Sequence, residues 1–169
     1  MPEDKIPDSF DDFMNPEPET TQDDKSEKET LEDRFTRERF LWGGKVKGMS
    51  AKLKGEIMQV AELQTEVYTE RQIALEYYHY IISLLIKINK SYNKTYSAKW
   101  RFYTYEGNER LPNESVKTNR IVSELGDIKE KREVLDNHAK FMDGTIKTID
   151  NIIFGLKTRT EIEQIRRGR

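Results

Sequence analysis

The sequence predicts an all-α fold, in which a long antiparallel helical hairpin with short terminal helices assembles through coiled-coil-like packing into a homo-oligomer. Three observations predict it. Apolar residues recur every three to four positions over most of residues 49–105 and 125–156, four of the five prolines fall within residues 1–33, and only 35% of the 169 residues are hydrophobic. Helices with so few apolar residues usually cover their apolar stripe by self-association.

An acidic tail precedes the helical part of the chain. Residues 1–33 hold 13 Asp and Glu against three Lys, a net charge of −10, whereas the other 136 residues carry a net charge of +8. The tail has too few apolar side chains to offset the entropy cost of ordering, so we expect residues 1–33 to be disordered and residues 34–169 to form one helical domain. This asymmetry is typical of proteins that bind polyanions, and also of proteins with an acidic solubility tail.

The first helices are predicted from spacing and from helix-breaking residues. Residues 31–42 read as a short helix, after which Gly43, Gly44 and Gly48 are expected to loosen the backbone. Residues 49–105 contain no proline and one glycine, and they predict one long helix or two helices in line.

A polar loop separates this part from the last helix. Residues 106–115 contain Gly107 and Pro112, and either Asn113 or Ser115 is placed to cap the helix that follows.

The last helix has the most regular apolar pattern, a seam that starts at Leu125, ends at Leu156 and advances in steps of three and four. Arg132 is its one charged member, and a charge at such a position can fix register or partner choice. We expect oligomerisation through the apolar members Leu125, Ile128, Leu135, Met142, Ile146, Ile149 and Ile153.

Residues 81–105 carry five cations and no acid. On a helix, Lys87, Lys90, Lys94 and Arg101 fall within about 60° of one another, roughly opposite an apolar and aromatic stripe. A phosphate backbone can follow such a row, and counterion release then gives affinity without sequence preference. The stripe continues the core, so most of its aromatic rings are expected to be buried, with Phe102, Tyr103 and Tyr105 as candidates for base stacking. The candidate DNA-binding residues are Lys87, Lys90, Lys94, Lys99, Arg101 and Tyr103.

Nothing in the sequence indicates an enzyme, a metal site or a cofactor. There is no cysteine, there are two histidines, and no phosphate-binding glycine loop or nucleophile motif occurs. Glu76 and His79 have the spacing of a di-iron ligand pair, but the second pair is missing because position 135, three residues before His138, is Leu. The most apolar stretch, residues 73–88, is too short and polar to span a membrane, and no signal peptide is visible, so we expect a cytoplasmic protein.

Two short motifs carry a family resemblance. Lys99-Trp100-Arg101-Phe102-Tyr103-Thr104 closes the basic helix and resembles the K-W-E-Y-Y-T-G signature of the UvsY family, the recombination mediators of T-even-type bacteriophages. Leu156-Lys157-Thr158-Arg159-Thr160 is similar to the L-N-S-R-T-like segment of that family, and the order of elements agrees from about residue 32 to residue 169.

The chain departs from the family pattern at several places. Arg101 replaces the usual Glu and raises the basicity, Tyr105 stands where Gly is common, and Glu161 replaces an aromatic residue. The acidic tail and the arginine-rich end, with Arg166, Arg167 and Arg169, are not typical of the family either.

The resemblance implies a ring-like, all-helical homo-oligomer that binds single-stranded DNA. Such a protein helps a RecA-like recombinase displace the single-strand-binding protein, and it acts in the cytoplasm of the host cell if a phage encodes it. The family's basic residues before the aromatic pair contribute to DNA binding, a role that maps to Lys99, whereas Lys94 and Arg101 come from the charge pattern. An alternative is a structural coiled-coil scaffold or adaptor of phage assembly, which would bind little DNA.

Overall fold

The computed structural model describes residues 30–55, 57–106, 111 and 113–168. These residues contain no strand, and their helical elements in chain order are α2 (Leu31–Leu53), α3 (Ile57–Arg101), the π-helical turn η1 (Phe102–Glu106), α4 (Glu114–Glu124) and α5 (Gly126–Arg167). The all-α prediction is confirmed. The predicted disorder of residues 1–29 lies outside the described residues.

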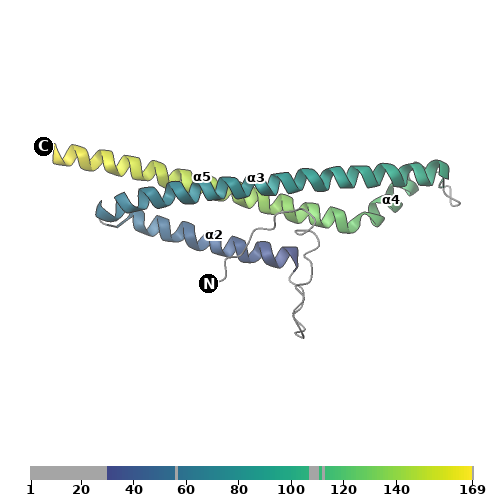
Figure 1. Cartoon of the computed structure of the whole chain (residues 1–169), viewed down its shortest axis with the longest axis horizontal. Coiled ribbons are helices and arrows are strands. Elements are labelled where there is room, and N and C mark those ends of the chain that lie inside the picture. The colour runs from purple at the N-terminus through teal and green to yellow at the C-terminus, as the bar shows by residue number, and fades with distance from the viewer. Residues whose placement is uncertain (1–29, 56, 107–110, 112, 169) are drawn as a thin grey trace, which may run out of the picture.

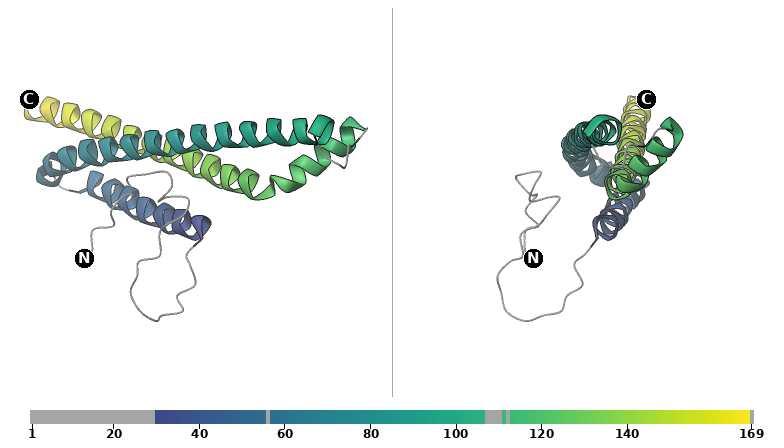
Figure 2. Two further views of the ribbon diagram at one scale, coloured as in Figure 1. Left: turned by 45° about the vertical axis from the view of Figure 1, so that its right-hand side comes forward. Right: turned by 90° about the vertical axis from the view of Figure 1, so that its right-hand side faces the viewer.

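The two longest helices, α3 and α5, form the predicted antiparallel hairpin (Figure 1). Helix α2 lies beside them over half of their length, and α4 connects the far end of α3 to α5 (Figures 1 and 2). The C-terminal end of α5 extends past the turn between α2 and α3 (Figure 1). The molecule is therefore elongated, with α2 packed beside the hairpin near one end and α4 at the other (Figure 1).

Helix α2 starts at a capping box. The Thr30 hydroxyl accepts a hydrogen bond from the Asp33 backbone N–H at 3.1 Å, and the Asp33 carboxylate accepts one from the Thr30 N–H at 3.3 Å. Both backbone donors are thus paired, and residues 31–33, assigned to the tail from the sequence, form the first helical turn.

The predicted end of this helix near Trp42 is wrong, because α2 continues through its three glycines to Leu53. Its buried side chains are Phe35, Trp42 and Met49, which pack against α3 and α5. Glycine costs a helix about 1 kcal/mol relative to alanine, and the burial of large side chains outweighs such a cost.

The prediction of one helix, or of two helices in line, over residues 49–105 is also wrong, because the chain reverses at Lys54 and Gly55 and α3 runs back along α2 (Figure 1). The Lys54 and Gly55 N–H groups donate to the Ala51 and Lys52 carbonyls at 3.1 and 2.9 Å, which closes α2. The Arg159 guanidinium of α5 donates to the carbonyls of Leu53 and Gly55 across the turn. Carbonyls that a helix end leaves unpaired are therefore satisfied by a distant side chain.

The seam of α5 forms the core together with α2 and α3. Its members Leu135, Met142, Ile149 and Ile153 are buried within the chain, as are Leu125 and Ile146, whereas Ile128 is half-buried. The seam thus holds one protomer together, and its part in self-association stays a prediction.

A polar cluster of the half-buried Glu38 and Tyr77 and the buried His138 joins the three long helices. His138 is fully buried with its Nε2 3.2 Å from a Glu38 carboxylate oxygen, and the Tyr77 hydroxyl donates to the same oxygen. Burial disfavours the Glu38 anion, but the close His138 ring and the hydrogen bond from Tyr77 outweigh it and hold the Glu38 pKa below its usual value. Phe35 stacks on the His138 ring at 4.0 Å between centroids.

The glycines of α2 provide a test of its helical course. A Cβ at Gly44 or Gly48 would meet no atom within 4 Å, so Gly44→Ala and Gly48→Ala should each raise the free energy of unfolding by about 0.5–1 kcal/mol in urea titrations. Gly155→Ala on α5 is the contrasting control, since its Cβ would lie 3.0 Å from a Leu53 methyl group. Destabilisation by both α2 substitutions would contradict a helix at these positions.

Glu38→Gln should lower the free energy of unfolding at pH 7 by about 1.5–3 kcal/mol, the usual contribution of hydrogen bonds to a charged group. Because the folded pKa of Glu38 is lowered from 4.5, its contribution is present above that pH and is lost as the pH falls through the folded pKa. Urea titrations between pH 7 and pH 3 should therefore converge for parent and variant. The exposed Glu62 provides the control Glu62→Gln, with little change at any pH.

Candidate nucleic-acid interface

The four cations Lys87, Lys90, Lys94 and Arg101, called here the basic ridge, are all exposed on α3. The ridge lies roughly opposite the buried α3 side chains, because those side chains face α5 and α2. From Lys87 to Arg101 it extends about 21 Å along the axis at 1.5 Å per residue. No ion pair within the described part of the chain involves Lys90, Lys94 or Arg101.

The aromatic stripe of α3 is packed. Tyr92, Tyr96 and Trp100 stack in sequence with ring centroids 6.2 Å apart at both steps. All three rings are half-buried against a cluster of Tyr103, Ile121 and Leu125. These rings therefore belong to the core at the far end of the hairpin.

Lys99 of α3 and Tyr103 of η1 both bind Glu124 of α4. The Lys99 Nζ is 2.5 Å from one Glu124 oxygen, and the other oxygen accepts hydrogen bonds from the Tyr103 hydroxyl at 2.5 Å and the Arg120 Nε at 2.9 Å. Hydrogen bonds from Lys99, Tyr103 and Arg120 lower the pKa of Glu124 to about 2. We call these four residues the Glu124 network.

The Glu124 network is separate from the basic ridge. At 100° per residue, Lys99 lies about 120° to 180° around α3 from each ridge residue. The six predicted DNA-binding residues thus occupy two surfaces, with four cations on the ridge and Lys99 with the buried Tyr103 on the α4 side.

Helix α4 supplies functional candidates that the sequence did not reveal. Lys117 is 6% exposed, donates to the Thr104 hydroxyl at 2.8 Å and places its Nζ 4.7 Å from the Trp100 ring centroid. The spacing of Lys117, Arg120 and Glu124 places them on one face of a helix, which the sequence shows. Their partners lie on α3 and η1, on the other side of the loop, and only the structure brings these partners to them. Of the two predicted caps, Asn113 is the one that caps α4, its side chain accepting a hydrogen bond from the Ser115 N–H at 2.9 Å.

The π-helical turn η1 presents two exposed aromatic rings at the end of α3, Phe102 and Tyr105, which are 48% and 70% exposed. Both are available to stack on a base, as expected, whereas Tyr103 between them is 8% exposed. η1 thus places one of its three aromatic rings in the core and two at the surface.

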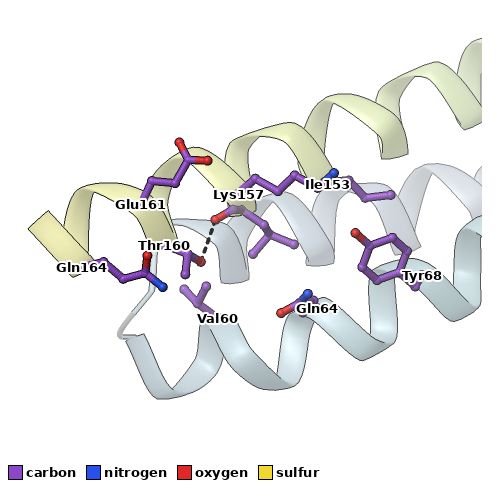
Figure 3. A pocket seen from close by; sticks show the side chains of 9 residues that line it. Val60, Gln64, Tyr68, Ile153, Lys157, Thr160, Glu161 and Gln164 are labelled. Atoms are coloured by element: carbon purple, nitrogen blue, oxygen red, sulfur yellow. Dashed lines mark hydrogen bonds between the residues drawn. The ribbon is translucent and has the colours of Figure 1, made fainter.

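A groove lies at the opposite end of the hairpin, between the start of α3 and the end of α5 (Figure 3). Its volume is about 210 Å³, and Val60, Gln64 and Tyr68 line one side while Ile153 and Thr160 line the other. The exposed apolar side chains nearby on α5 are Phe154, Ile162 and Ile165.

Within the described residues, no three or more His, Asp and Glu side chains gather as a metal site would require. Glu76 and His79 are both exposed. The described helices include none that is both long and apolar enough for a membrane span.

An elongated helical hairpin with an exposed row of cations is typical of helical proteins that bind a polyanion. Comparison with protein families matches residues 52–169 to the family described as "Recombination, repair and ssDNA binding protein UvsY". The chain therefore belongs to the UvsY family, and its general function is single-stranded DNA binding in recombination and repair. The match covers α3, η1, α4 and α5, whereas all but the last two residues of α2 precede it. Comparisons with curated proteins and with solved structures found no match.

The Glu124 network can be tested by removing one donor. Tyr103→Phe keeps the buried ring but takes away a hydrogen bond to the carboxylate, so the pKa of Glu124 should rise from about 2 toward its usual value. Carboxyl ¹³C NMR titration measures this shift. The control Tyr105→Phe changes an exposed tyrosine and should leave the Glu124 pKa unaltered. An equal pKa in parent and Tyr103→Phe would show that the hydroxyl does not bind Glu124.

Proposed function

We propose that the chain is a recombination mediator that binds single-stranded DNA along the basic ridge and helps load a RecA-like recombinase onto DNA covered by single-strand-binding protein. The observation that carries the proposal is the ridge itself, an exposed row of cations in a stretch, residues 81–105, that contains no acid. Phosphates that replace the counterions of such a row gain affinity that depends on salt and not on base sequence.

The aromatic residues at the end of the ridge support a preference for single-stranded over duplex DNA. Phe102 and Tyr105 are exposed next to Arg101, where unpaired bases can stack on them. The bases of a duplex are already stacked, so only the cations would contribute to duplex binding. Lys99 and Tyr103 remain part of the proposed site on its α4 side.

Self-association would multiply these weak contacts. We propose a ring-like homo-oligomer, because several ridges on one strand gain avidity through effective concentration. Most of the predicted seam is buried within the chain, whereas the exposed Phe154, Ile162 and Ile165 offer apolar surface to a second copy, as does the groove at this end of the hairpin (Figure 3).

The recombinase and the single-strand-binding protein enter the proposal through the family's role in recombination. The experiment follows recombinase filament assembly on single-stranded DNA saturated with single-strand-binding protein. The chain should shorten the lag, and an unchanged lag despite DNA binding would contradict the loading role.

Ridge substitutions should weaken DNA binding through salt-dependent contacts. For Lys90→Ala with Lys94→Ala, we expect the log–log salt slope of poly-dT binding to decrease by about 1.4, at 0.7 per phosphate, in fluorescence anisotropy titrations. Lys140→Ala with Lys147→Ala is the control, since it removes the same charge from α5 where both lysines pair with aspartates.

Equal losses in both double variants would show that net charge and not the ridge governs binding. A well-folded oligomer that fails to bind poly-dT at low salt would contradict DNA binding altogether and favour a structural coiled-coil assembly.

A further inference from the structure

In the Glu124 network, one carboxylate forms ion pairs with two cations, Lys99 and Arg120, on the α4 side of the proposed DNA-binding site. Lys99 comes from the end of α3 and Arg120 from α4, so Glu124 connects two elements that flank the loop. Their side chains are 35% and 60% exposed, and that of Glu124 is 25% exposed. The network is thus open to solvent and within reach of a ligand.

Phosphate and carboxylate compete for the same donors. Lysine ammonium and arginine guanidinium groups form charge-assisted hydrogen bonds with either anion. Ion pairs at this exposure are individually weak and easily exchanged. Lys99 lies about 160° around the helix from Arg101, so a strand that follows the ridge must cross the end of α3 over η1 before its next phosphates reach the network.

Tyr103 gives Glu124 a partner that DNA does not remove. The hydroxyl is on a buried ring and binds the Glu124 oxygen that Arg120 also contacts. When both cations turn outward on their flexible stems, the carboxylate keeps this hydrogen bond and stays beside α3.

We infer that Glu124 is an internal competitor of single-stranded DNA, which holds Lys99 and Arg120 in the DNA-free protein and releases them to the phosphates of a bound strand. This inference rests on the proposed DNA binding and adds Arg120 and Glu124 to it. It assigns Tyr103 the role of a positioning residue, which keeps the displaced carboxylate in place. Binding by the basic ridge alone is then the weaker first step.

The test measures poly-dT affinity of the full-length chain by fluorescence anisotropy. Glu124→Gln frees both cations, so we expect binding at low salt to be roughly threefold to tenfold tighter and the salt slope to be steeper. The control Asp143→Asn makes the same charge change and frees Lys147 from an exposed ion pair on α5. Its affinity should stay near that of the parent.

A second comparison separates the network from a general charge effect. In a chain that already carries Lys99→Gln and Arg120→Gln, Glu124→Gln should tighten binding no more than Asp143→Asn does. Carboxyl ¹³C NMR of the unaltered protein provides a measurement that needs no variant, since the Glu124 signal should shift when poly-dT saturates the chain.

The outcomes are distinguishable. Binding by the parent that Glu124→Gln leaves unchanged, or an unmoved Glu124 signal in a saturated complex, would overturn the internal competitor and leave the basic ridge standing. No binding by the parent or by Glu124→Gln would overturn both proposals together. Binding by Glu124→Gln alone would support the competitor in its strongest form.

Discussion

The antiparallel packing of α3 against α5 is the interaction on which the rest of the structure depends. Each helix has one apolar stripe, and the two stripes cover each other from the α2–α3 turn to Leu125. Because each stripe occupies one side of its helix, the other side of α3 remains at the surface from Lys87 to Arg101. The basic ridge exists there because the packing needs no residue from that side.

Helix α2 completes the core on the second side of the hairpin, although most of it precedes the residues that match the family. Phe35, Trp42 and Met49 fill the space between α3 and α5, and Glu38 reaches the buried His138. A buried histidine beside a carboxylate costs desolvation, so the cluster contributes more to the placement of α2 than to net stability. Arg159 fixes the other end of α2 by binding the carbonyls of the turn.

Periodicity predicted the long helices because a three-to-four spacing of apolar residues that is sustained over many turns is typical of a helix with one buried side. It failed at the turn because Met49 and Leu53 continue the spacing of α3 although they belong to α2. An apolar period reports which side of a helix is buried, and it does not report chain direction. The reversal depends on Gly55 and on Arg159, more than 100 residues later, and no local pattern contains both.

The candidate site also has one part that the sequence predicted and one part that only the structure reveals. The basic ridge is a property of one helix, so spacing alone located it. The partners of Lys99 and Tyr103 are on α4, and only the folded chain brings Glu124 to them. The K-W-R-F-Y-T motif therefore serves two purposes, since Trp100 and Tyr103 close the core at the same point where Arg101 and Phe102 face solvent. A short motif with alternating buried and exposed residues ties the geometry of the proposed DNA-binding surface to the stability of the hairpin end.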